Sequence, residues 1–123
     1  AFTGFLPPIG GADATGGSFA KPLQTFPMGS AVPVKFTAAC HGSPVLSGIH
    51  RLQVVKYLSQ TDSQRAIDAV AQDAATAGNQ FRLAGGQWYF NLDTKATRMS
   101  VGKWLLLATL SDGSQHSVWI QLK

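Results

Sequence analysis

Glutamate is absent from this sequence, and paired cysteines, clustered basic residues and long apolar runs are missing too. All six acidic residues are aspartates, which excludes a catalytic site built on a glutamate general acid or base. No run approaches the ~18 apolar residues of a membrane-spanning segment, which predicts a soluble chain without a membrane span. The sequence opens with Ala1 and shows no signal peptide, as expected of a processed protein or an excised fragment.

The net charge of +4 is distributed in a way that argues against nucleic acid as a partner. The ten lysines and arginines are spread along the chain and form no basic run. Binding to phosphates needs a local basic patch rather than a mild overall excess of positive charge. We therefore expect no nucleic-acid partner.

The side chains that usually carry chemistry also lack a usable arrangement. Cys40 is the single cysteine and has no partner for an internal disulfide, and neighbouring His41 points to the opposite face of a strand. The histidines and aspartates lack the spacing of a zinc site or a calcium loop, and no Gly-x-Ser-x-Gly motif occurs. Ser111, Asp112 and His116 are close in sequence, but their pattern is that of a turn. The sequence therefore predicts no catalytic residue, no metal ligand, no cofactor and no enzymatic activity.

Length predicts one domain that covers residues 1–123. Residues 1–17, "AFTGFLPPIGGADATGG", are rich in glycine and proline and have no sustained periodicity. We interpret residues 1–24 as an extended amino-terminal segment rather than a helix. Its apolar side chains are too numerous for a free linker, so part of it should pack against the domain through Phe2, Phe5, Leu6 and Ile9.

Alternation of apolar and polar residues predicts a series of short strands. Residues 30–40 form one of them, and Pro33 is expected at a sheet edge or strand start because proline has no N–H to donate. "IHRLQVVKYL" (49–58) forms another, and two more flank Gly85-Gly86. The side chains predicted to face the core from the first two strands are Val32, Val34, Phe36, Ala38, Leu52, Val54 and Leu58.

The final stretch, "KWLLLATLSDGSQHSVWIQLK" (103–123), predicts a hairpin whose turn sets its register. A two-residue Asp112-Gly113 loop pairs even-numbered residues of one strand with odd-numbered residues of the other. A three-residue loop from Ser111 to Gly113 instead pairs even with even and odd with odd. We favour the three-residue loop, with Gly113 in the left-handed region, because it collects the more regular apolar set on one face. The resulting pairs are Leu106 with Val118, Trp104 with Ile120, and Leu105 with Trp119.

A different periodicity interrupts the strands at Asp62–Ala75, "DSQRAIDAVAQDAA". Apolar residues recur here at helical spacing, and Asp62 or Ser63 can cap the start, so we predict one short inserted helix. We expect it to pack on the edge of the sheets through Ile67 and Val70. With about seven short strands and this one helix, the pattern predicts an all-β fold, an antiparallel β-sandwich.

Several motifs follow one another through the chain and together resemble one known family. They are "FTGFLPPI" (Phe2–Ile9), "GSAVPVKF" (Gly29–Phe36), "GNQFRL" (Gly78–Leu83), "WYFNLDTK" (Trp88–Lys95) and "ATLSDGSQHSVWIQLK" (Ala108–Lys123). In this order they resemble the PxKF domain, a module that recurs in secreted and surface-attached bacterial proteins. The match runs nearly from end to end, which makes it more specific than any one motif.

The resemblance implies an immunoglobulin-like sandwich that serves as a non-catalytic accessory domain, commonly at the carboxyl end of larger extracellular proteins, including hydrolases. It also implies a secreted or cell-surface bacterial location and neighbouring domains of the same protein as partners. No catalytic residues are attributed to the family. Many members carry two cysteines, whereas only Cys40 is present here, so a family disulfide does not carry over.

The candidate binding residues are large side chains that we expect to face outward from the last sheet: Tyr89, Leu105, Leu107 and Trp119. Contiguous exposed apolar patches usually mark interaction surfaces, and planar aromatic rings suit stacking on sugar rings. Three interpretations stay open: Asp62–Ala75 or the amino-terminal "FTGFLPPI" covers this face, a neighbouring domain contacts it, or a polysaccharide binds it. We therefore expect an accessory module that extends, stabilises or anchors a larger extracellular protein, with a carbohydrate-binding module as the alternative.

Overall fold

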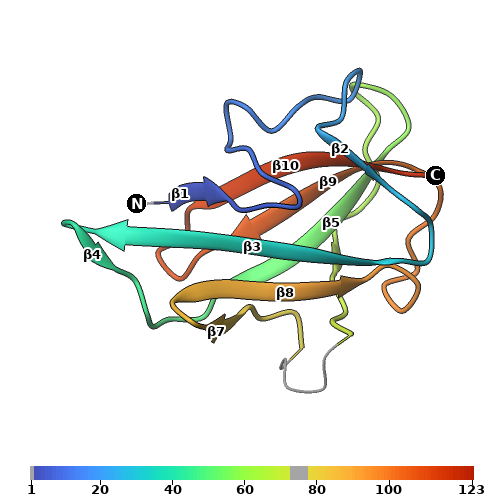
Figure 1. Ribbon diagram of the computed structural model, residues 1–123. Coiled ribbons are helices and arrows are strands. Elements are labelled where there is room, and N and C mark those ends of the chain that lie inside the picture. Colours follow the sequence, from blue (N-terminus) through green and yellow to red (C-terminus); the bar gives the residue numbers. More distant parts are fainter. Residues whose placement is uncertain (1, 73–77) are drawn as a thin grey trace.

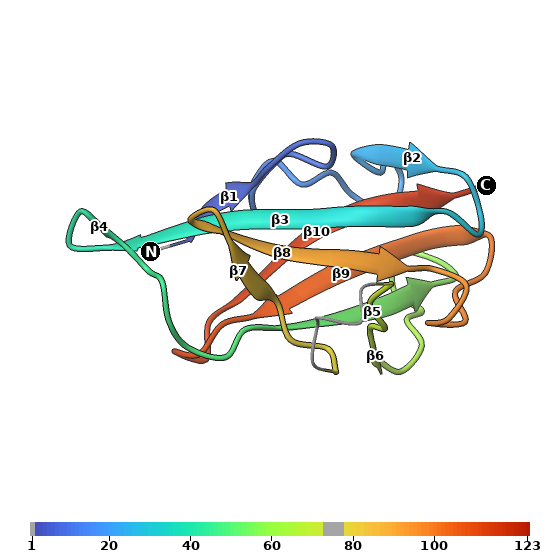
Figure 2. The ribbon, with the colours of Figure 1, turned by 60° about the horizontal axis from the view of Figure 1, so that its bottom comes forward.

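Two β-sheets packed face to face make up the structure, a computed structural model that describes residues 2–72 and 78–123 (Figures 1 and 2). The described residues contain strands and turns but no helix, so this part of the chain is all-β. The first sheet has the order β1-β3-β8-β7, with β4 paired to β3, and consists of β1 (Phe2–Phe5), β3 (Ala31–Cys40), β4 (Ser43–Pro44), β7 (Arg82–Ala84) and β8 (Gln87–Asp93). The second has the order β2-β10-β9-β5-β6 and consists of β2 (Gln24–Phe26), β5 (Arg51–Tyr57), β6 (Ile67–Asp68), β9 (Gly102–Thr109) and β10 (Gln115–Leu122).

The core lies between the sheets and follows the alternation of the strands. β3 buries every second side chain, and the predicted inward set of Val32, Val34, Phe36 and Ala38 is confirmed. Leu52 and Val54 of β5 are also fully buried. Burial of each such large side chain stabilises the fold by roughly 1.5–3 kcal/mol relative to exposure. The prediction for Leu58 is wrong, because β5 ends at Tyr57 and Leu58 is 56% exposed.

Pro33 lies where β3 is hydrogen-bonded on one side only. β1 pairs with β3 at Ala38 and Phe36, and its last contact is the N–H of Leu6 donating to the carbonyl of Lys35. Pro33 is therefore beyond the end of β1, and its missing N–H leaves no gap in a ladder. β3 is an inner strand of its sheet, but at Pro33 it has a paired neighbour on one side only, as expected of an edge position.

The last hairpin has the predicted register. Leu106 pairs with Val118, Trp104 with Ile120 and Leu105 with Trp119. The three-residue loop is closed by the N–H of Leu110 donating to the carbonyl of Ser114, and Gly113 has a φ of 86°. A residue with a Cβ is strained at this φ, so glycine here permits the bulged turn and thereby fixes which side chains of β10 enter the core.

The amino-terminal segment is part of both sheets. β1 pairs antiparallel with β3 in the first sheet, and β2 runs parallel to β10 in the second. Phe5 and Ile9 are buried in the core, and Phe2 packs against it, which confirms that this segment is not a free linker. Both ends of the segment from Phe2 to Phe26 are thus held by backbone hydrogen bonds.

The predicted helix at Asp62–Ala75 is wrong over residues 62–72, and residues 73–75 lie outside the described residues. The backbone here bonds to both sheets instead: the N–H of Ala69 donates to Leu52 of β5, and the N–H of Gln72 donates to Asn91 of β8. Tertiary hydrogen bonds across one side of the sandwich replace the local bonds that a helix would make. Ala69 is buried, whereas Val70 is 42% exposed, so the side-chain pattern is not that of one helical face. In residues 2–72 and 78–123, no helix is long and apolar enough to cross a membrane.

Candidate functional site

The outer face of the second sheet carries three of the four candidate binding residues. Leu105, Leu107 and Trp119 point away from the core because their strand neighbours Leu106 and Val118 are fully buried. All three are half-buried rather than freely exposed. The prediction that these three side chains face outward is therefore confirmed. Each of them is also partly covered by other residues of the chain.

Tyr89 does not belong to this face. It lies on β8 in the first sheet and points outward on the opposite side of the sandwich. Two cations flank its ring, with Lys35 Nζ 5.6 Å and Arg82 Cζ 5.0 Å from the ring centroid. The expectation that Tyr89 joins Trp119 in one patch is wrong, because β8 pairs with β3 and not with a strand of the last hairpin.

Trp119 packs against two other aromatic rings, and we call Phe19, Tyr57 and Trp119 the aromatic cluster. The Tyr57 ring centroid lies 4.6 Å from that of Trp119, and the Phe19 ring meets the indole edge-on at 6.2 Å. Lys103 Nζ caps Phe19 at 4.5 Å from its ring centroid. Part of the indole surface is therefore occupied within the molecule itself.

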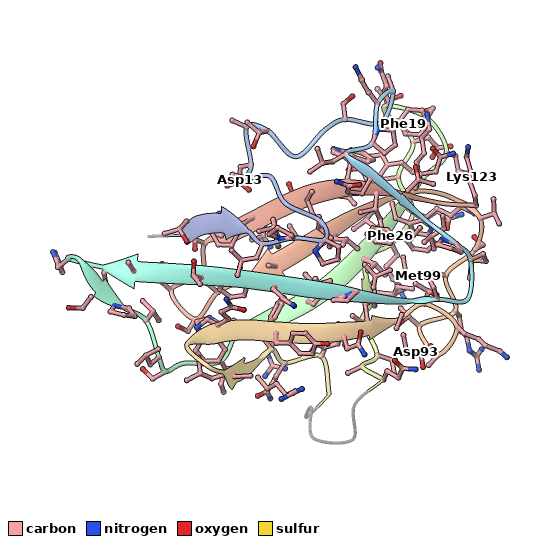
Figure 3. All side chains as sticks on the ribbon, in the orientation of Figure 1. Asp13, Phe19, Phe26, Asp93, Met99 and Lys123 are labelled. Carbon is pink, nitrogen blue, oxygen red and sulfur yellow. The ribbon has the colours of Figure 1, made fainter. Side chains whose placement is uncertain are left out.

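A short loop at residues 17–22 brings Phe19 to this position. Gly17 and Pro22 form a bridge across the loop, and the N–H of Ser18 donates to the carbonyl of Lys21. On either side of the loop, the N–H of Trp119 donates to Gly16 and the N–H of Leu23 donates to Trp119. Figure 3 shows Phe19 and Asp13 on loops of the amino-terminal segment beside β10. The ring that packs on Trp119 thus comes from neither Asp62–Ala75 nor "FTGFLPPI", the two segments suggested by the sequence.

We predict that Phe19→Ala increases acrylamide quenching of tryptophan fluorescence. Trp88 and Trp104 are each only 4% exposed, so Trp119 is the indole that acrylamide reaches most readily. Loss of the edge-on contact should also lower the free energy of unfolding by about 0.5–1.5 kcal/mol. In a Trp119→Phe background the same substitution should leave quenching unchanged, and an increase there would mean that Phe19 shields a different indole.

A second feature of this face is polar and lies at the other end of β9 and β10. Arg51, Thr109 and Gln115 are neighbours in one cross-strand row, whereas Tyr57 and Lys103 occupy a row at the opposite end. A hollow of about 340 Å³ opens here, lined by Arg51, Gln53, Asp68, Asn79, Thr109 and Gln115. Sequence reasoning missed it because Asp68 was assigned to a helix, which hid its pairing with Gln53.

His116 lies between a carboxylate and a hydroxyl in an order that resembles a catalytic triad. Its Nδ1 is 2.8 Å from Asp13 Oδ2, and its Nε2 is 3.0 Å from Ser114 Oγ. The Phe2 ring stacks on the imidazole, with centroids 4.1 Å apart. The second carboxylate oxygen of Asp13 accepts the N–H of Ser117. Asp13 therefore fastens the amino-terminal segment to β10.

The surroundings of Ser114 do not favour a nucleophile. Its hydroxyl donates to Asp112 Oδ1 at 2.6 Å, and its N–H donates to the same carboxylate. These two bonds hold the pKa of Asp112 below its ordinary value of 3.8, so this carboxylate is negatively charged near neutral pH. An oxyanion needs free N–H donors, yet the N–H of Gly113 is already bonded to Leu110 and a negative charge adjoins Ser114. The cluster is better explained as a fastening of the turn and the amino-terminal segment.

The remaining histidines and the cysteine differ in their burial. His50 is buried, accepts the N–H of Ser111 at Nδ1 and therefore donates from Nε2 to the carbonyl of Ser47. Cys40, the last residue of β3, and His41, in the turn that follows, are both exposed. Within the described ranges, no three histidine, cysteine or acidic side chains gather as a group that could hold a metal ion.

Comparisons with family models, with curated proteins and with solved structures gave no match to this chain. The functional argument therefore depends on the geometry of the strands and of the outer faces. Of the four candidate residues, that geometry brings together Leu105, Leu107 and Trp119 and separates Tyr89 from them.

Proposed function

We propose that this chain is an immunoglobulin-like module of the PxKF kind, and that it extends, stabilises or anchors a larger secreted or surface protein without catalysing a reaction. The strand order supports the immunoglobulin-like part. With β1, β3, β7 and β8 taken as strands A, B, D and E, and β5, β9 and β10 as C, F and G, the two sheets are ABED and CFG. β6 extends the second sheet beside β5, as strand C′ does in variable-type domains.

One observation carries the spacer role: the two chain ends leave from opposite ends of the sandwich (Figure 1). Thr3 Oγ1 donates to the carbonyl of Thr37 near the end of β3, whereas the carbonyl of Lys123 accepts the N–H of Met28 shortly before β3 begins. The ten residues of β3 span about 33 Å at ~3.3 Å per residue. Segments joined at the two ends would therefore be held apart by the length of the sandwich.

The bacterial, secreted or cell-surface location of this proposal is supported by the sequence resemblance alone. The aromatic cluster supports contact with a neighbouring domain, because a half-buried indole and its leucine neighbours leave apolar area on the surface. Such a contact would use Trp119, Leu105 and Leu107. Tyr89, on the opposite face, would be available to a second neighbour.

A second candidate function is polysaccharide binding through the same three side chains. The observation that favours it is the partial exposure of Trp119 beside Tyr57, since aromatic rings offer a flat apolar surface to a sugar. Retention of the chain on an immobilised polysaccharide, with loss of retention in Trp119→Ala, would support it. Equal retention of the two proteins would exclude Trp119 from binding.

The spacer proposal predicts a fixed separation between two domains fused to the ends of this chain. Single-molecule energy transfer between donor and acceptor proteins at the two ends should give one narrow distribution of efficiencies. A Gly/Ser linker of equal length should give a broad one, because flexible chains sample many end-to-end distances. A broad distribution for the folded chain would contradict the spacer role.

A further inference from the structure

The hollow at the polar end of the second sheet, lined by the six residues given above, is here called the polar pocket. Its volume of about 340 Å³ falls at the lower end of the ~300–1,000 Å³ range of small-molecule sites. Its walls come from β5, β6, β9 and β10 and from Asn79, which precedes β7. It is separate from the aromatic cluster, which occupies the other end of the same face.

A chain of hydrogen bonds holds the planar side chains of this pocket in place. Asn79 is 8% exposed and donates from Nδ2 to the carbonyl of Leu52 at 3.2 Å and to Asp68 Oδ1 at 3.3 Å. Arg51 Nη1 donates to Asn79 Oδ1 at 3.1 Å, and Gln53 Nε2 donates to Asp68 Oδ1 at 3.0 Å. A guanidinium, two carboxamides and a carboxylate are thereby oriented by one another before any ligand arrives.

These bonds leave several groups available to a ligand. Between described residues, the hydrogen bonds of Asp68 involve only Oδ1, so Oδ2 remains as an acceptor. Toward residues 2–72 and 78–123, the side chain of Arg51 donates from Nη1 alone, which leaves its other N–H groups as donors. The Gln53 and Gln115 amides donate from Nε2, to Asp68 and Thr109, and keep their oxygens as acceptors. The pocket thus offers donors and acceptors side by side.

The charges of the pocket select against an ionic ligand. Among the described residues that line it, Arg51 and Asp68 are the charged side chains, and they share Asn79 as a hydrogen-bond partner. Their charges offset each other, so neither a phosphate nor an ammonium group finds the net opposite charge that it needs. A neutral ligand with several hydroxyl groups fits, because each hydroxyl both donates and accepts.

We propose that the polar pocket binds a saccharide. Sugar hydroxyls can donate to Asp68 Oδ2 and accept from the remaining N–H groups of Arg51. Leu107 adjoins the pocket, since it pairs with Gln53 and lies two residues from Thr109 on the same outward face. Its half-buried side chain offers an apolar surface to the C–H face of a sugar ring. This proposal does not depend on the spacer role, and the site shares Leu107 alone with the Trp119 surface.

Titration of the ¹⁵N-labelled chain with cellobiose, maltose, mannobiose and N,N′-diacetylchitobiose tests the proposal by NMR. At least one disaccharide should shift the resonances of Arg51, Gln53 and Gln115. Gln115→Ala should weaken binding about tenfold, because a hydrogen bond to the ligand is lost. Gln121→Ala is the matched control, since Gln121 faces outward from the same strand at the other end of the face, and it should leave affinity unchanged.

Other outcomes overturn the proposal. No shift with any of the four disaccharides, or binding that survives both Gln115→Ala and Asp68→Ala, would exclude the polar pocket. Shifts centred on Trp119 and abolished by Trp119→Ala would assign sugar binding to the aromatic cluster instead. Competition by inorganic phosphate would contradict a neutral ligand. Because Gln115 is exposed, its alanine variant should fold even if Asp68→Ala does not.

Discussion

Phe36→Ala will lower the free energy of unfolding by about 3–5 kcal/mol, roughly a fifth or more of the stability of a typical small domain. Phe36 is fully buried on β3, where its ring centroid lies 4.8 Å from that of Phe81, 5.4 Å from that of Phe2 and 6.4 Å from that of Trp88. Removing the ring leaves a cavity between residues on different strands, and no single strand can move to fill it. The loss therefore combines the transfer energy of the ring with the energy of an unfilled cavity.

Urea unfolding followed by circular dichroism measures this effect without relying on the fluorescence of Trp88, which contacts the replaced ring. Leu58→Ala is the control, because Leu58 is 56% exposed and its removal should change stability by less than about 0.5 kcal/mol. If Phe36→Ala cost no more than Leu58→Ala, the core between the two sheets would not be packed as described.

The second large effect is expected for Gly17→Ala, which should lower stability by about 1–3 kcal/mol more than Gly29→Ala does. Gly17 has a φ of 81°, and an added Cβ would lie 2.7 Å from the nitrogen of Leu23 and 2.8 Å from the carbonyl oxygen of Lys21. Both are backbone atoms and cannot rotate away, so the loop at residues 17–22 must shift. Phe19 should then leave Trp119, and acrylamide quenching should rise as it does in Phe19→Ala.

Gly29→Ala separates the clash from the backbone strain. Gly29 has a similar φ of 86°, but an added Cβ there meets no atom within 4 Å. Strain in the left-handed region alone costs roughly 1–2 kcal/mol, and both variants should show it. Equal losses of stability in the two variants would mean that the loop at residues 17–22 does not pack closely on itself. Unchanged quenching in Gly17→Ala would mean that the conformation of this loop does not control the contact between Phe19 and Trp119.

The last hairpin could be predicted in detail because local chemistry determined it. The turn residues Ser111, Asp112 and Gly113 specify a bulged three-residue loop, and that loop fixes the parity of every pair between β9 and β10. Alternation in β3 was equally informative, since both its pattern and its burial repeat every two residues. In such segments the information lies within one element and its immediate turn.

The prediction failed where contacts between residues far apart in the sequence determine the backbone conformation. Residues 62–72 have apolar residues at helical spacing, yet Ala69 and Gln72 find their hydrogen-bond partners in β5 and β8. Tertiary bonds outweighed a helical propensity that amounts to less than about 1 kcal/mol per residue. Tyr89 was misplaced for a related reason: alternation gives the face of a strand but not the sheet to which that strand belongs.

In the candidate sites, too, local patterns could be predicted and contacts between distant segments could not. Leu105, Leu107 and Trp119 could be assigned to one outward face, because the hairpin register follows from its turn. The packing of Phe19 on Trp119 could not be found, since Phe19 lies on a loop about a hundred residues earlier in the chain with no periodicity of its own. The polar pocket depends on Asp68, which lies in the segment that was predicted as a helix, and on Asn79, which precedes β7.

Opposite exits of the two chain ends are the central claim of the spacer proposal, and one distance tests it. Spin labels at Thr3→Cys and Lys123→Cys, in a Cys40→Ser background, should give one narrow electron paramagnetic resonance distance. Thr3 lies beside Thr37, and Lys123 bonds to Met28 before β3 starts, so about seven strand residues and the sheet separation predict roughly 20–35 Å. A distance below about 15 Å corresponds to at most four or five residues of a strand. It would place both chain ends at the same end of the sandwich and contradict the spacer proposal.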